Sequence, residues 1–252
     1  MQLTFSEPVR EHHFKLRCFP LSDERQKILN ERVEIYPVHF SSKERDSFGN
    51  LCVYGTTREI HQQFSVNVEG EAEIAPHAEL KAETFRAGVF RYATELTRAG
   101  ESIRDFYESF DFPGNMTDYE RALCMMSALH ENFTYSPGVT GVGTTAEQAM
   151  TLGRGVCQDY AHILLSLCRL ERIPCRYIAG MIQGEGATHA WTEIYDSGIW
   201  RMIDPTHNRT CDDTYIKISS GRDAKDCAIN QGVFYGGGRQ TQTVRVSVNV
   251  LT

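Results

Sequence analysis

The sequence predicts an α+β fold, in which a β-rich first third is followed by a mixed region of helices and strands. The first 75 residues contain short runs that alternate apolar and polar side chains, as half-buried strands do. The middle of the chain carries apolar residues at three- and four-residue intervals, which is typical of helices. The last third returns to strand-like runs that are separated by glycines. At 252 residues the chain can form one large domain or two modest ones, and we place a boundary between residues 1–76 and 77–252.

The N-terminal unit, residues 1–76, is predicted to be a small antiparallel sheet or a β-sandwich. Residues alternate in polarity over 14–18 and again over 64–68. The segment Asp46–Asn50 has the composition of a turn and precedes an apolar run that begins at Leu51.

Helices are predicted next, over residues 79–96, 118–133, a short stretch after 144–148, and 155–171. Thr117 and Glu120 have the spacing of a capping box, and residues 144–148 contain two overlapping boxes. Pro174 limits the last helix. Beyond it we expect strands over 176–181, 189–195 and 200–203, and a final half-buried strand over 244–250.

Composition and charge exclude several classes of protein. The chain has 41% hydrophobic and 23% charged residues, as ordinary globular proteins do. Its net charge of −7 provides no broad cationic surface, so we expect no nucleic-acid partner. No run of about 18 apolar residues and no signal-peptide pattern is present, so we expect no membrane partner and a cytoplasmic location.

The eight cysteines form no C-x-x-C pair, and we interpret most of them as reduced, buried thiols. A zinc site assembled only in space remains a minor alternative. The glycine-containing loop at residues 137–143 lacks the Rossmann spacing and the Walker lysine, and no EF-hand pattern occurs. The prediction is therefore that the protein uses no cofactor and no metal.

Three short motifs carry the chemistry, and each contains one reactive side chain. Cys157 follows Gly153 and Gly155 at the first turn of a predicted helix, where unpaired N–H groups and the helix dipole stabilise a thiolate or an oxyanion. His189 opens an aromatic strand, and Asp204 ends the next strand just before a proline.

The two strand ends are expected to meet, because adjacent antiparallel strands align the start of one with the end of the other. Asp204 can then orient the imidazole of His189. A nucleophile, a base and an orienting group in the order Cys157, His189, Asp204 follow the logic of a cysteine acyl-transfer enzyme.

These motifs resemble the bacterial transglutaminase-like superfamily. The resemblance runs from residue 133 to 206 and comprises GxGVCQDYAH, R-x-P-x-R-Y-I-A-G, HAW and DPT. It implies a papain-like core, in which a helix that bears the cysteine packs on an antiparallel sheet. It also implies Cys157 as nucleophile, His189 as general base and acid, and Asp204 as the orienting carboxylate. Residues 1–75, including DSFGN, are similar to the β-sandwich domain that often precedes this core in bacterial members.

Neighbouring polar residues have simpler interpretations. His162 lies on the helix of Cys157 but on a different side, so we expect it to satisfy a local hydrogen bond. Trp191 shares a strand face with His189 and either lines the acyl site or fills the core. His207 either tunes the cleft or, as we expect, belongs to a loop.

The sequence therefore predicts a cysteine enzyme that cleaves an amide or peptide bond through a thioester at Cys157 and takes a peptide or amide-containing substrate. Hydrolysis is the first choice, because no motif is dedicated to an amine acceptor. The alternatives are a transglutaminase, a peptide de-N-glycosylating amidase, which the missing C-x-x-C pairs disfavour, and a non-catalytic binding or scaffold protein.

Overall fold

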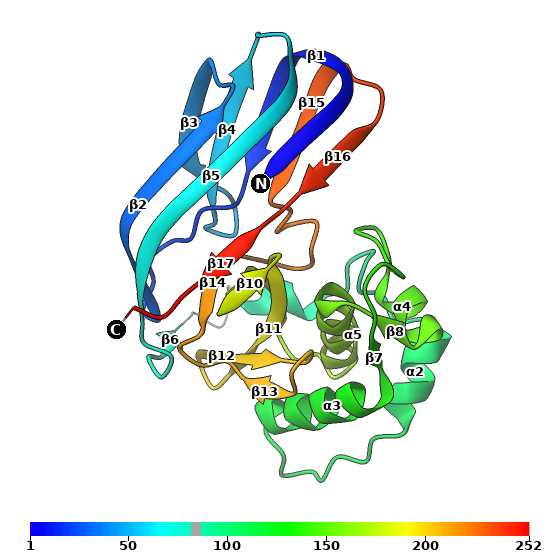
Figure 1. The fold of residues 1–252 in the computed structure, drawn as a ribbon. Helices are drawn as coiled ribbons and strands as arrows, with labels where there is room; N and C mark the ends of the chain where they lie inside the picture. Colours follow the sequence, from blue (N-terminus) through cyan, green and yellow to red (C-terminus); the bar gives the residue numbers. More distant parts are fainter. Residues whose placement is uncertain (82–86, 252) are drawn as a thin grey trace.

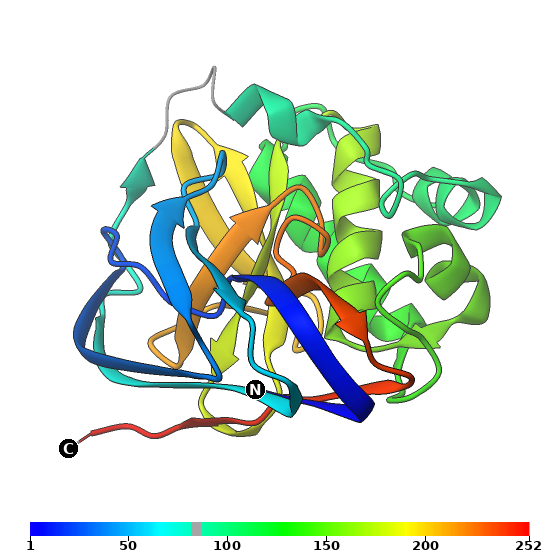
Figure 2. The ribbon, with the colours of Figure 1, turned by 90° about the horizontal axis from the view of Figure 1, so that it is seen from above.

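A computed structural model describes residues 1–81 and 87–251 and shows two antiparallel sheets and a helical layer (Figure 1). Seen from above, the second sheet lies between the first sheet and the helices (Figure 2). The predicted α+β class is confirmed. None of the helices within the described ranges combines the length and hydrophobicity needed to cross a membrane.

The first sheet contains all the strands predicted in the N-terminal third. It has the order β2-β5-β1-β4-β3, and its strands are β1 (Gln2–Leu16), β2 (Gln26–Tyr36), β3 (Phe40–Arg45), β4 (Leu51–Thr57) and β5 (His61–Ile74). The structure has one curled sheet here in place of the two sheets of a sandwich. The register shifts within β1 explain the curl, because bulges bend and twist a strand. Phe14, Phe64 and Val66 lie buried on its inner face.

The end of the chain returns to this first sheet. Strands β15 (Asn230–Gly236) and β16 (Gln240–Thr243) both pair antiparallel with β1. Strands from beyond the expected boundary at residue 76 therefore complete the N-terminal sheet. Of the predicted strand over 244–250, only β17 (Val246–Val248) forms, and it pairs with β10 (Gly184–Gly186).

The second sheet has the order β13-β12-β11-β9-β14, and β6 pairs with β12. Its strands are β6 (Leu80–Lys81), β9 (Cys175–Ile182), β11 (His189–Asp196), β12 (Ile199–Asp204), β13 (Arg209–Thr210) and β14 (Tyr215–Gly221). The three strands predicted after Pro174 are confirmed as β9, β11 and β12. The edge strand β14 is an addition that the sequence pattern did not reveal.

Helix α5 (Cys157–Leu170) packs against β9 and β11 of this sheet and contacts helices α2 (Glu101–Glu108), α3 (Asp118–Asn132) and α4 (Ala146–Leu152). All its residues from 159 to 169 are buried. The capping box of Thr117 and Glu120 on α3 is confirmed, and Thr145 with Gln148 forms the box on α4. Next to α5, the short strands β7 (Thr134–Tyr135) and β8 (Arg154–Gly155) pair in parallel.

The helix expected over residues 79–96 does not cover that range. Leu80 and Lys81 form strand β6, and Gly88–Arg91 is a 3-10 helix, η1, whereas residues 82–86 lie outside the described residues. Buried Leu80 and Phe90 pack in one cluster with Trp200 of β12. Tertiary packing therefore overrides the Ala- and Glu-rich composition of these described segments.

Side-chain amides from the first sheet cover the free edge of β14. Asn50 accepts from the backbone N–H of Ser220 and donates to its carbonyl, both at 2.8 Å. Gln26 makes the same pair of bonds with the backbone of Lys217, also at 2.8 Å. Each amide forms the pair of hydrogen bonds that a neighbouring strand would form. At an open edge the backbone N–H and C=O groups would bond to water, whereas here they join the two sheets.

Asn50→Ala is expected to destabilise the protein by about 2–4 kcal/mol, because it leaves the buried N–H and C=O of Ser220 without their partner. Urea unfolding measures this change. Asn67→Ala is the matched control, since Asn67 is exposed and its side chain donates to the exposed Glu69 on the same strand. Equal stability of the two variants would contradict this account of the joint between the sheets.

Candidate active site

Cys157 is the first residue of α5 and is half-buried. Two glycines make its approach possible. Gly153 ends α4 in the left-handed conformation, at φ 67°, where glycine is favoured. At Gly155 a Cβ atom would lie 2.4 Å from Oδ2 of Asp159, so no larger residue fits there. The GxG spacing is therefore a structural requirement of the turn that presents Cys157.

Asp159 holds the same turn from within the helix. Its buried Oδ2 accepts from the backbone N–H of Val156 at 2.7 Å and from Oγ1 of Thr140 at 2.6 Å. Burial raises the pKa of this carboxyl in spite of these two hydrogen bonds. Asp159 thus fixes the entry into α5 and ties the loop of Thr140 beside Cys157.

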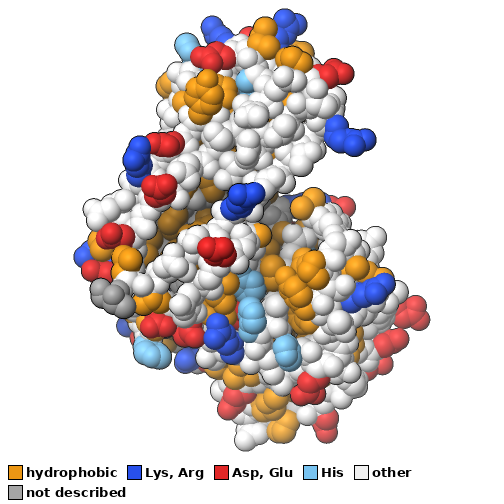
Figure 3. Space-filling model, viewed as in Figure 1, with side chains coloured by type: hydrophobic (Ala, Val, Ile, Leu, Met, Phe, Trp, Pro, Cys, Tyr) orange, Lys and Arg blue, Asp and Glu red, His pale blue; other side chains and the backbone are white. Residues whose placement is uncertain are grey.

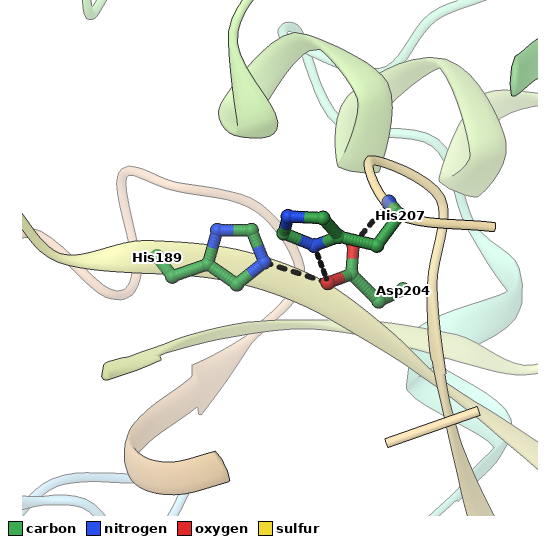
Figure 4. Close-up of side chains that lie close together, drawn as sticks. All are labelled: His189, Asp204 and His207. Carbon is green, nitrogen blue, oxygen red and sulfur yellow. Dashed lines mark hydrogen bonds and ion pairs between the residues drawn. The ribbon is translucent and has the colours of Figure 1, made fainter. Parts of the chain in front are cut away.

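His189 and Asp204 lie at the ends of adjacent strands, as the sequence predicted. His189 opens β11 and Asp204 closes β12, and the strands pair antiparallel with Thr192 opposite Ile203. Figure 4 shows the His189 ring directed at the carboxylate, with Nε2 2.7 Å from Oδ2. The side chain of His189 is 8% exposed, and that of Asp204 is fully buried.

Asp204 accepts hydrogen bonds from several groups. On Oδ2 it also accepts from Nδ1 of His207 at 2.7 Å and from the hydroxyl of Tyr215 at 2.8 Å. Oδ1 accepts from the backbone N–H of Thr206 at 2.8 Å. Burial alone would raise the pKa of this carboxyl, but the bonds from His189, His207 and Tyr215 hold it well below its ordinary value. Asp204 is therefore an anion whose position is fixed from three directions.

The imidazole of His189 links this anion to the cysteine. Burial alone would lower the pKa of His189, but hydrogen bonds with Asp204 and with Cys157 raise it to about 9. Because Nε2 points to Asp204, Nδ1 is the nitrogen left for Cys157. The structure thus brings together all three residues that the sequence singled out, with His189 in the middle and cationic near neutral pH.

Trp191 fills the core behind His189, which decides between its two interpretations. Its side chain is fully buried and its ring stacks on His189 at 6.1 Å between centroids, with Tyr215 edge-on at 5.3 Å. At Gly180 on the neighbouring strand, a Cβ would lie 2.2 Å from the Trp191 ring. The glycine of R-x-P-x-R-Y-I-A-G and the tryptophan of HAW therefore fit each other.

His162 and His207, the other two histidines near the motifs, differ in burial and in their hydrogen bonds. His162 is buried, which lowers its pKa to about 4, and its Nε2 accepts from the backbone N–H of Ala224 at 3.1 Å. The expected hydrogen bond exists, although its partner is distant in the sequence. His207 lies in the turn after β12, as the sequence favoured, and in addition donates to Asp204. Its position three residues after Asp204, in the turn that caps that carboxylate, was the available signal.

The atoms of His189, Asp204 and His207 that could ligate a metal lie within 4.8 Å of one another. Here, however, the two imidazole nitrogens point at one carboxylate oxygen and share it by hydrogen bonds. The arrangement is a set of hydrogen bonds centred on Asp204.

In Figure 3, which has the view of Figure 1, histidine side chains reach the surface (pale blue). Hydrophobic side chains (orange) border them on the side of the helices. Tyr135 lies near Cys157 and is about half exposed, and Val142, whose carbonyl accepts from the side chain of Gln158 next to Cys157, is 86% exposed. Burial is the larger cause of the raised pKa of Tyr135. The cysteine therefore lies beside an accessible apolar rim.

Comparison with known proteins assigns the two parts of the chain. Residues 111–205 match the transglutaminase-like superfamily, and residues 1–73 match the bacterial transglutaminase-like N-terminal region. The protein has a transglutaminase-like core that is preceded in the chain by a bacterial transglutaminase-like N-terminal region.

Relatives of this transglutaminase-like protein extend over nearly its whole length. An uncharacterized protein of Mycobacterium leprae is 26% identical and covers 98% of this chain and 95% of its own. One from Mycobacterium tuberculosis is 25% identical, covering 98% and 89%. A crystal structure from Cytophaga hutchinsonii, described as a "Putative Cysteine Protease", has a TM-score of 0.80 at 23% identity and covers 100% of this chain and 89% of its own. That likeness shows that the fold is shared along the whole chain.

Proposed function

We propose that this transglutaminase-like protein is a cysteine hydrolase that cleaves an amide or peptide bond through a thioester at Cys157. The observation that supports it best is the position of His189, which is hydrogen-bonded to the buried anion of Asp204 and lies close enough to Cys157 for that thiol to contribute to its raised pKa. An imidazolium beside a thiol favours the thiolate, which is the nucleophilic form.

In the first half of the reaction, the Cys157 sulfur attacks the substrate carbonyl carbon and the carbonyl electrons move to oxygen. In this proposal, backbone N–H groups at the start of α5 stabilise that oxyanion, because the first N–H groups of a helix have no partner within it. When the C–N bond breaks, His189 gives its proton to the leaving amine, and the acyl group remains on sulfur as a thioester. Asp204 keeps the ring oriented throughout.

In the second half, His189 takes a proton from water while the water oxygen attacks the thioester carbonyl. The C–S bond then breaks, the free acid leaves and the thiolate–imidazolium pair is restored. Transfer to an amine uses the same thioester, so the triad alone does not distinguish the two outcomes. Water is favoured because Gly184–Gly186 of β10, which precede His189, are all exposed, as is most of the loop over 138–143.

The test is the partition of the acyl-enzyme. Peptide and cell-wall fragment libraries are incubated with the protein and rising glycine methyl ester, and products are identified by mass spectrometry, with Cys157→Ala as background control. We expect the free acid to dominate even with millimolar amine. Mainly amide product at low millimolar amine would mean that the protein is a transglutaminase instead.

A further inference from the structure

One carboxylate oxygen of Asp204, Oδ2, accepts hydrogen bonds from two histidines. Oδ2 lies 2.7 Å from Nε2 of His189 and also 2.7 Å from Nδ1 of His207 (Figure 4). The two rings are 5.2 Å apart and reach the carboxylate from different segments, His189 from β11 and His207 from the turn after β12. His189 is almost completely buried, whereas the side chain of His207 is 46% exposed.

We propose that His207 is a positioning residue of the triad, which divides the charge of Asp204 between two imidazole rings. An oxygen that accepts a second strong hydrogen bond is a weaker acceptor for the first. His189 therefore holds its proton less tightly than it would with Asp204 to itself. The inference rests on the proposed function, because a more acidic imidazolium passes its proton more readily to the leaving amine.

Other groups also face this pair, and they define what a variant of His207 changes. Cys157 faces His189 from α5, and the hydroxyl of Tyr215 donates to Asp204 from β14. Arg209 in turn donates to that hydroxyl at 3.1 Å. The pKa of Cys211 is raised by burial and, to a smaller extent, by the nearby charge of Asp204. All of these remain when His207 is replaced, and so do the backbone bonds to Oδ1.

His207 is also the most accessible of the three side chains that donate to Oδ2. Tyr215 is 3% exposed, so its removal would open a void in the core. Loss of the half-exposed imidazole of His207 leaves no such void. Its substitution therefore changes the hydrogen bonding of Asp204 with little change in packing.

The test follows the ring of His189 directly. Histidine is labelled with ¹⁵N, and NMR titration of wild type, His207→Ala, His207→Asn and the exposed control His77→Ala gives the His189 pKa in each. We expect His207→Ala to raise it by about half a pH unit or more. His207→Asn should restore the wild-type value, because its amide places an N–H near the position of Nδ1. An unchanged or lower value in His207→Ala, or the same rise in His207→Asn, would overturn the proposal.

A kinetic measurement extends the test to catalysis. On an amide substrate, His207→Ala should lower kcat about threefold with KM unchanged, and His207→Asn should recover most of it. A lower kcat with a higher KM and a loss of thermal stability, which Asn does not rescue, would show a structural role instead. The NMR result does not need turnover, so a protein that shows the His189 shift without hydrolysing anything would refute the proposed function and leave the charge division intact.

Discussion

Replacing Cys157 with alanine is expected to remove all turnover. A thioester needs a cysteine thiol, and burial raises the pKa of Cys211, the other thiol near Asp204, so Cys157 is the nucleophile of the site. The free energy of unfolding should stay within about 1–2 kcal/mol of wild type, since the thiol is small and half-buried. Turnover is measured on the substrate found in the library screen, and stability by urea unfolding.

The same residue is expected to be the most reactive of the eight thiols. Exposure alone would make Cys124 on α3 the most reactive thiol, because Cys124 is exposed and Cys157 is half-buried. Timed alkylation with iodoacetamide at neutral pH, followed by peptide mapping, separates the two explanations. Activation by His189 predicts that Cys157 is alkylated first, and that His189→Ala reverses the order. If Cys124 reacts first in the wild type, the nucleophile has been assigned wrongly. Cys124→Ala is the control and should retain full activity.

The sequence predicted the start of α5 and the strand ends of His189 and Asp204 because these depend on local patterns. A glycine-bearing turn before an apolar helix, and two alternating strands joined by a short turn, can be recognised from neighbouring residues. The contact between His189 and Asp204 then follows from hairpin geometry.

What the sequence did not reveal depends on pairing between distant segments. Strand β15 joins β1 across more than 200 residues, and no alternation within 230–236 indicates which strand will be its neighbour. Tyr215 reaches Asp204 from β14, an edge strand without its own sequence signal. The sequence did not reveal the hydrogen bond of His207 for a related reason. The role of a turn residue is visible only when the carboxylate that it contacts is in place.

Asp204→Asn is expected to lower kcat by about 10³–10⁴ while changing substrate affinity little. An asparagine offers one oxygen and one NH₂ group where the site supplies donors on both sides. If its NH₂ group replaces Oδ2, it meets the donors of His189, His207 and Tyr215. If it replaces Oδ1, it meets the backbone N–H of Thr206. Either orientation breaks hydrogen bonds and removes the charge that holds the His189 proton.

Stability should change with pH in a direction that the two pKa shifts determine. Asp204 has a lowered pKa in the folded protein, so its contribution is present above about pH 4 and is lost in acid. The pKa of His189 is raised from 6.5 to about 9, so its contribution is complete below pH 6.5 and disappears as the pH rises through 9. The advantage of wild type over Asp204→Asn in urea unfolding should therefore be largest near pH 5–6 and shrink toward pH 9. Asp212→Asn is the control, because that half-exposed carboxylate lies on the connection between β13 and β14 and bonds to Arg209 and Thr214 rather than to the triad. An advantage that is constant from pH 5 to pH 9, or activity above about half of wild type in Asp204→Asn, would remove Asp204 from the triad.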